Sequence, residues 1–102
     1  GFVVETAEGN FYYSGDTALT SDMELIGAGP RLTFAVLCIG GNFTMDQADA
    51  VVAAEMVHCD EIVGVHYDTF PQIKIDHQQA KRRFEEAGKT LHLLKIGESR
   101  KF

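Results

Sequence analysis

The stretch Glu61-Ile62-Val63-Gly64-Val65-His66-Tyr67-Asp68-Thr69-Phe70-Pro71 decides the fold that the sequence predicts. Its first part is apolar and β-branched, which favours a buried strand that ends at His66. Gly64 inside this run indicates that another part of the chain packs closely against the strand. Ligands of α/β sheets bind beyond the carboxyl ends of the strands, so His66 is a candidate metal ligand. Asp68 can orient the imidazole or bind beside it.

Strands and helices are expected to alternate after an opening hairpin whose turn lies at 7–10. The expected strands are 2–6, 11–14, 33–39, 61–66 and 90–96, and the expected helices are 22–28, 45–58 and 76–87. This alternation predicts an α/β fold, with helices packed on the sheet and right-handed crossovers between parallel strands.

The two longer helices carry start and stop signals. Thr44 and Gln47 have the spacing of a capping box for helix 45–58, which is apolar on most sides and should be well buried. Asp76 can cap helix 76–87, and Gly88 is its expected C-terminal stop. The apolar stripe of helix 76–87 is narrow, so its basic residues should face water; these are Lys81, Arg82 and Arg83.

The composition is that of an ordinary domain, with 102 residues, 45% of them hydrophobic and 24% charged. We expect one domain, 1–102. A net charge of −6 argues against a nucleic-acid partner. The sequence shows no membrane span or signal peptide, so we expect a cytoplasmic protein. Cys38 and Cys59 lack metal-site spacing and are expected to be reduced core thiols.

Polar, glycine-rich turns follow three of the expected strands, at 15–17, 40–42 and 66–69. If these strands are parallel, the turns lie at one edge of the sheet. Glycines let a ligand approach the backbone, and Asn42 lies just before a helix N-terminus, which favours an anion. Asp16 offers an oxygen ligand and His66 a nitrogen ligand, a combination that suits zinc or manganese better than calcium or magnesium.

Each of these residues also has a structural interpretation. Asp16 can cap the helix that follows it, Gly40 and Gly41 can form only a turn, and His66 can be hydrogen-bonded within the protein. Two ligands do not complete a metal site, because catalytic zinc takes about three from the protein. The sequence contains no HxH, HxxxH or HExxH arrangement, no P-loop and no nucleophile motif.

Four blocks in order carry a resemblance to a known family. They are Tyr12-Tyr13-Ser14-Gly15-Asp16-Thr17, Asp22-Met23-Glu24-Leu25-Ile26-Gly27, Ile39-Gly40-Gly41-Asn42-Phe43-Thr44-Met45 and His66-Tyr67-Asp68-Thr69-Phe70-Pro71. From about residue 1 to residue 76, the chain resembles the C-terminal half of the metal-dependent hydrolases of the metallo-β-lactamase superfamily. The nearest branch is the one related to the ascorbate-phosphate lactonases.

The resemblance implies half of a four-layer αββα sandwich and a divalent metal site at the sheet edge. It implies that Asp16 is the metal-ligating, often bridging aspartate and that His66 is the last metal-ligating histidine. Zinc is the expected metal, with manganese or iron as alternatives, and metal-activated water would attack an ester, lactone, amide or phosphoester bond. The pocket for a small-molecule substrate would be lined by Gly40, Gly41, Asn42 and Asp68.

The chain departs from the family in three ways. Cys38 stands where a proline is usual, and Asp68 stands where an asparagine is common. The HxHxDH motif and the next ligand histidine of the family are absent. Because a complete domain of this kind has roughly 200 to 250 residues, and because the chain begins inside an expected strand without a methionine, we expect a piece of a longer protein. An uncovered apolar face would favour a homo-oligomer or association with the missing N-terminal half.

Three hypotheses follow. The first is a fragment of a metal-dependent hydrolase that is inactive alone and enzymatic in the full-length protein. The second is a non-catalytic α/β domain that binds an anionic small molecule at the glycine-rich edge and survives Asp16→Ala. The third is a structural module, in which alanine at Asp16 or His66 changes only stability.

Overall fold

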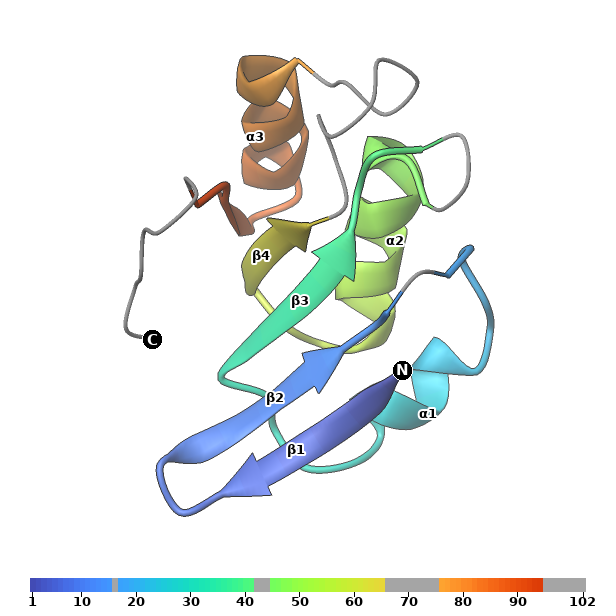
Figure 1. The fold of residues 1–102 in the computed structure, drawn as a ribbon, viewed down its shortest axis with the longest axis vertical. Coiled ribbons are helices and arrows are strands. Elements are labelled where there is room, and N and C mark those ends of the chain that lie inside the picture. The colour runs from blue at the N-terminus through green and yellow to red at the C-terminus, as the bar shows by residue number, and fades with distance from the viewer. Residues whose placement is uncertain (16, 42–44, 66–75, 95–102) are drawn as a thin grey trace.

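The computed structural model describes residues 1–15, 17–41, 45–65 and 76–94, which form a five-stranded mixed sheet in the order β1-β2-β3-β4-β5. The strands are β1 (Phe2–Thr6), β2 (Gly9–Tyr13), β3 (Phe34–Cys38), β4 (Glu61–Val65) and β5 (Thr90–His92). The helices are α1 (Met23–Gly27), α2 (Gln47–Met56) and α3 (His77–Glu86). The predicted α/β class is therefore confirmed (Figure 1). Among these residues, the helices are too short or too polar to cross a membrane.

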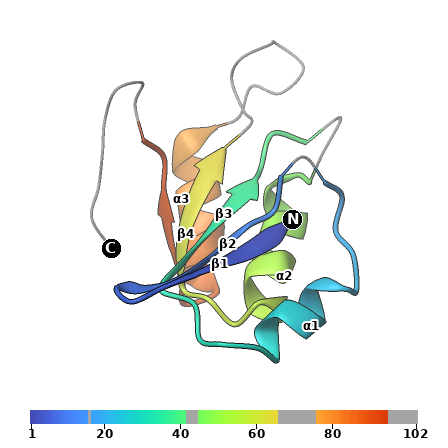
Figure 2. The same ribbon diagram turned by 60° about the horizontal axis from the view of Figure 1, so that its bottom comes forward.

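The connections between the strands put all three helices on one face of the sheet. β1 and β2 are antiparallel, whereas β2, β3, β4 and β5 are mutually parallel neighbours in chain order. Successive crossovers of one hand, each moving one strand along, leave their helices on the same side. Figures 1 and 2 show α1, α2 and α3 behind the sheet when β1 to β3 are in front. The other face of the sheet carries none of these helices.

The opening hairpin is confirmed, but its turn is shorter than predicted. Gly9 and Asn10 belong to β2 and pair with Thr6 and Glu5, so only Ala7 and Glu8 connect the strands. The hydroxyl of Thr6 donates to the carbonyl of Gly9 at 2.6 Å. This bond stabilises the tight two-residue connection.

The predicted capping box of α2 is wrong. Gln47 is the first helical residue, so it cannot occupy the third helical position that the box requires. The N-cap is Asp46, whose carboxylate accepts a hydrogen bond from the backbone N–H of Asp49 at 2.8 Å. An ionised carboxylate at this position also interacts favourably with the helix dipole. Thr44 lies outside the described residues.

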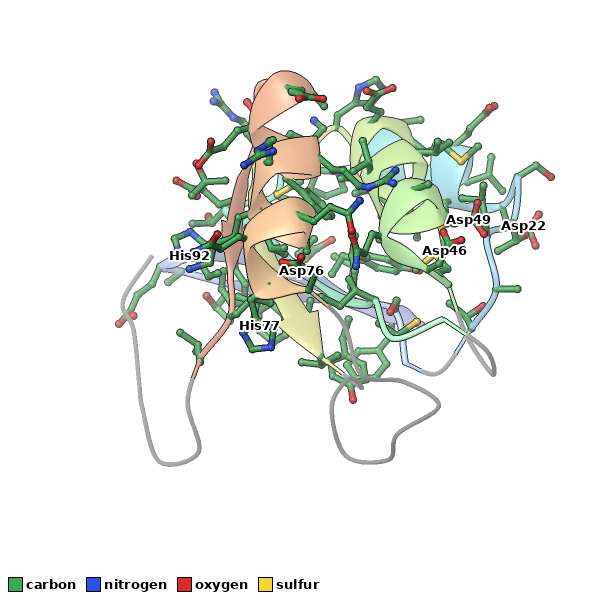
Figure 3. The ribbon with its side chains drawn as sticks, turned by 90° about the horizontal axis from the view of Figure 1, so that it is seen from above. Asp22, Asp46, Asp49, Asp76, His77 and His92 are labelled. Carbon is green, nitrogen blue, oxygen red and sulfur yellow. The ribbon has the colours of Figure 1, made fainter. Side chains whose placement is uncertain are left out.

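The signals predicted for α3 are confirmed at both ends. Asp76 accepts from the backbone N–H of Gln79 at 3.1 Å (Figure 3 labels Asp76 at the start of the helix). Gly88 N–H donates to Glu85 at 2.9 Å and Lys89 N–H to Phe84 at 2.9 Å, which is the pattern of a Schellman stop. As predicted, Lys81, Arg82 and Arg83 are exposed.

The core lies between the sheet and the helices. Gly64 is buried in β4, and a methyl group there would come within 2.6 Å of Ile39 Cδ1 and 2.9 Å of Leu93 Cδ2, so the predicted close approach is confirmed. α2 is less buried than predicted. It directs Ala50, Ala53 and Ala54 into the core, but Val52 on its outer side is 40% exposed.

The uncovered face of the sheet is apolar and aromatic. Phe11 pairs with Phe34 in register, and their rings stack with centroids 4.9 Å apart. Phe2 stacks on Tyr13 at 5.5 Å, and these side chains are 57% and 38% exposed. Val36 pairs with Tyr13 and so lies on the same face. We call Phe2, Phe11, Tyr13, Phe34 and Val36 the open face.

Candidate functional site

The carboxyl ends of β2, β3 and β4 meet at one edge of the sheet. Tyr13 lies beside Val36, and Cys38 lies beside Val65, so the central strand β3 ends between its two neighbours. Beyond the paired residues, Ser14 N–H donates to Val36 at 2.9 Å, and Ile39 N–H donates to Val65 at 3.1 Å. Neighbouring strands lie about 4.8 Å apart, so the chain leaves β2 and β4 roughly 10 Å apart on either side of β3.

Four of the predicted site residues lie outside the described residues: Asp16, Asn42, His66 and Asp68. Some of their neighbours in the sequence are described and lie at the ends of the strands. Gly15 and Thr17 flank Asp16 beyond β2, and Val65, the last residue of β4, directly precedes His66. The condition on which the predicted site depended, that these strands run parallel, is met.

The turn beyond β2 is held by a hydrogen-bond network within the protein. Ser14 is 2% exposed, and its hydroxyl donates to the Gly15 carbonyl at 2.9 Å and accepts from the Cys38 N–H at 3.3 Å. The Cys38 thiol is fully buried and donates to the Thr17 carbonyl at 3.3 Å. Both residues that flank Asp16 are therefore tied to side chains at the ends of β2 and β3.

Backbone hydrogen bonds also join the turn that follows β2 to the loop that follows β3. The Met45 N–H donates to the Thr17 carbonyl at 2.9 Å, and the Gly41 N–H donates to the Met45 carbonyl at 2.8 Å. Gly15 and Gly41 have φ angles of 64° and 71°, a left-handed conformation that residues with a Cβ rarely adopt. The two glycine turns therefore need glycine for their shape, whatever they bind.

Gly40 lines an open cleft of about 270 Å³ between the start of α2 and the side of α3. Arg83 and Gln79 reach the cleft from α3, while Asp46, Gln47 and Ala48 line it from α2. Helices run opposite to the parallel strands they connect, so the starts of α2 and α3 lie at the same edge as the strand ends. Figure 3 shows Asp46 and Asp76 at these ends. Among the described residues, Arg83 has no ion-pair partner.

Burial shifts the pKa values of two side chains. Burial, with a smaller contribution from the charge of Cys38, raises the pKa of Tyr12 above its ordinary value of 10.0. Burial likewise raises the pKa of the Cys59 thiol above 9.0, and the backbone interaction with Glu61 opposes this shift. Both cysteines are free and buried, as predicted. The shift of Tyr12 indicates that water solvates the interior near the end of β2 poorly.

The structural interpretation of Asp16 as a helix cap is wrong. α1 does not begin until Met23, and its N-cap position is occupied by Asp22, which makes no side-chain capping bond. No helix occupies residues 17–20. Within the described parts of the chain, no three His, Cys, Asp or Glu side chains come together as a metal site.

Sequence reasoning missed three residues of this region. Ser14 lies in the block 12–17 but was given no role, and Cys38 was expected to be a core thiol at a position where the family usually has proline, yet together they hold the turn. Arg83 was expected simply to face water, and it is exposed but also lines the cleft. The polar Ser14 beside an apolar strand end was the available signal for the network.

Comparisons with known proteins extend over nearly the whole chain. A UPF0173 metal-dependent hydrolase of Christiangramia forsetii is 56% identical over 99 residues, which cover 97% of this chain and 44% of that protein. A UPF0173 metal-dependent hydrolase of Flavobacterium johnsoniae is 50% identical over 99 residues, which again cover 97% of this chain and 44% of that protein. The chain thus spans less than half the length of the curated relatives it matches. No family model matches it.

A solved structure agrees with these relatives. Igni18, described as a novel metallo hydrolase from the hyperthermophilic archaeon Ignicoccus hospitalis, is 32% identical and superimposes with a TM-score of 0.86. The match covers 94% of this chain and 42% of Igni18. By sequence and by fold, the chain belongs to the family of UPF0173 metal-dependent hydrolases, to whose C-terminal half it corresponds.

Proposed function

We propose that the full-length protein, in which this chain follows an N-terminal half like that of its relatives, is a metal-dependent hydrolase of the metallo-β-lactamase superfamily. The observation that carries the proposal is the parallel order of β2, β3 and β4. This order brings Gly15, Cys38 and Val65 to one edge, next in sequence to the blocks that hold Asp16, Gly40 and His66. The family membership supports the same activity.

Asp16 and His66 are the residues of this chain that would hold the metal. The strands β2 and β4 end on either side of β3, and a carboxylate together with an imidazole is a donor set that suits a borderline divalent ion, for which we propose zinc, with manganese or iron as alternatives. The bound ion would supply an activated water and polarise the bond to be cleaved. This chain provides two ligands, so we propose that the others come from the N-terminal half and that the chain alone is inactive.

The substrate proposed is a small molecule with an ester, lactone, amide or phosphoester bond. Gly40 and Gly41 would let it approach the backbone, since a glycine adds no side chain at the end of β3. Asn42 and Asp68 would contribute polar contacts from the same edge. Asp68 adds a negative charge near the proposed metal, which would favour substrates without a second anionic group at that side.

Metal content tests this function. Elemental analysis of the gel-filtered full-length protein should find about one or two divalent ions per chain. Asp16→Ala and His66→Ala should each remove metal and hydrolysis, whereas Asp22→Ala at the start of α1 and His58→Ala after the end of α2, which change the same residue types outside the predicted site, should keep both. A full-length protein without metal, or one whose metal survives Asp16→Ala and His66→Ala, would contradict the proposal.

The cleft beside Gly40 favours a second candidate, the binding of an anionic small molecule without a metal. Arg83 supplies a cation there, and the start of α2 supplies backbone N–H groups. Titration calorimetry of the metal-free protein with inorganic phosphate should then detect binding that Arg83→Gln abolishes. Arg82→Gln, which alters an exposed neighbour outside the cleft, is the control. Loss of all phosphate binding in Asp16→Ala would argue against this candidate.

A further inference from the structure

Cys38 links the end of β3 to the turn that follows β2 through both its backbone and its side chain. Its backbone N–H donates to a side chain, Ser14 Oγ at 3.3 Å, and its thiol donates to a backbone carbonyl of the turn that follows β2, Thr17 O at 3.3 Å. Ser14 Oγ and Cys38 Sγ also lie 3.8 Å apart. The serine proton has a better acceptor in the Gly15 carbonyl, at 2.9 Å, so this third approach is mainly a packing contact.

Two of the acceptors in this network are the residues on either side of Asp16. The Gly15 carbonyl accepts from Ser14, and the Thr17 carbonyl accepts from both the Cys38 thiol and the Met45 N–H. A carbonyl oxygen has two lone pairs, so Thr17 is fully satisfied by this pair of donors. Ser14 and Cys38 are 2% and 0% exposed, which leaves little space for either side chain to change rotamer.

We propose that Cys38, acting with Ser14, is a positioning residue that holds the backbone on both sides of Asp16 for metal binding. The inference rests on the proposed function, because it assumes that Asp16 is a ligand. Groups that orient a ligand usually change metal affinity when they are removed, although they never touch the metal. Cys38 acts here through the Thr17 carbonyl and through Ser14, and its sulfur is not itself a ligand.

The test compares the two buried cysteines of the full-length protein. Cys38→Ala should weaken zinc or cobalt affinity about 10- to 100-fold, measured by chelator competition, because the Thr17 carbonyl loses its sulfur donor. Cys38→Ser should restore affinity close to the unmodified protein, since a hydroxyl can donate to the same carbonyl. Cys59→Ala is the matched control: its thiol is 2% exposed and donates to the Glu61 carbonyl at 3.4 Å, but at the other end of β4.

Urea unfolding of the same variants separates positioning from stability. Both alanine variants should lose similar stability, and only Cys38→Ala should lose metal affinity. If Cys38→Ala does not fold, Ser14→Ala breaks the tie to Gly15 and serves in its place. Equal affinity losses for Cys38→Ala and Cys59→Ala, or no rescue by Cys38→Ser, would overturn the inference.

Cobalt also reports whether the sulfur binds the metal. A thiolate-to-cobalt charge-transfer band that disappears in Cys38→Ser would make Cys38 a ligand and would overturn the positioning role. Failure of the proposed function has a different signature, because Asp16→Ala would then leave metal affinity unchanged. If Asp16→Ala abolishes metal binding and Cys38→Ala does not weaken it, the function stands and the positioning role is wrong.

Discussion

At the scale of the residue, Gly64 sets how closely β4 can pack. A methyl group there would come within 2.6 Å of Ile39 Cδ1, and Ile39 is fully buried and cannot simply move aside. Gly64→Ala should therefore reduce the free energy of unfolding by about 1 to 3 kcal/mol, the usual cost of overpacking. Urea unfolding measures this. Gly29→Ala, where the nearest atom is 3.4 Å away, should change stability far less, and equal effects would contradict the explanation.

Tyr12 should make stability depend on pH in the alkaline range. Burial raises its pKa above 10.0, so the folded state keeps the phenol proton to a higher pH than the unfolded state does. Below the unfolded pKa both states are protonated and the contribution to stability is fully present; it is lost as the pH rises through the folded pKa. Urea unfolding between about pH 9 and 11 should show a smaller loss in Tyr12→Phe than in the unmodified protein. Tyr13→Phe, which removes the exposed neighbouring phenol, should lose as much stability over this pH range as the unmodified protein does.

At the scale of the element, the helix starts offer an internal comparison. Asp76 caps α3 through the Gln79 N–H at 3.1 Å, whereas Asp22 occupies the N-cap of α1 without a side-chain bond. Asp76→Ala should cost about 1 kcal/mol, and Asp22→Ala should cost little, because only the first substitution leaves a backbone donor unsatisfied. Thermal unfolding monitored by circular dichroism measures both. Equal losses would mean that charge at the helix start, not the capping bond, is what stabilises α3.

The elements also show what the sequence could predict. Strand and helix order followed from apolar runs and from local signals such as Asp76 and Gly88, which act within one turn of the chain. The capping box predicted for α2 from the spacing of Thr44 and Gln47 failed because the helix begins at Gln47 and is capped by Asp46, and spacing alone does not locate the first helical residue. The burial of α2 was overestimated because it was judged from the number of apolar residues. Val52 is apolar but is 40% exposed on the outer side of the helix.

The surroundings of the candidate site followed from the sequence only in part. The common edge of the turns followed once the strands were assumed to be parallel, because parallel strands end on one side. The network of Ser14, Cys38 and Thr17 joins residues 21 and 24 positions apart in sequence, and no local pattern encodes it.

At the scale of the whole molecule, helices cover one face of the sheet, and the five residues of the open face lie on the other. The open face combines stacked aromatic pairs with Val36 across three neighbouring strands, β1, β2 and β3. Contiguous apolar surface of this kind marks an interaction site in soluble proteins. We expect it to pack against the N-terminal half in the full-length protein and to drive self-association when the chain is expressed alone.

A charge on the open face tests this expectation. Sedimentation of the chain expressed alone should give a mass above the 11.2 kDa monomer, and Val36→Lys should return it to the monomer, because a buried lysine ammonium without a partner opposes association. Leu25→Lys is the matched control: Leu25 is 73% exposed, more than any open-face residue, but it lies on α1, on the helix side. If exposed apolar area alone caused association, Leu25→Lys would reduce self-association more than Val36→Lys does. A chain that is monomeric without either substitution would show that the open face does not bind a second copy.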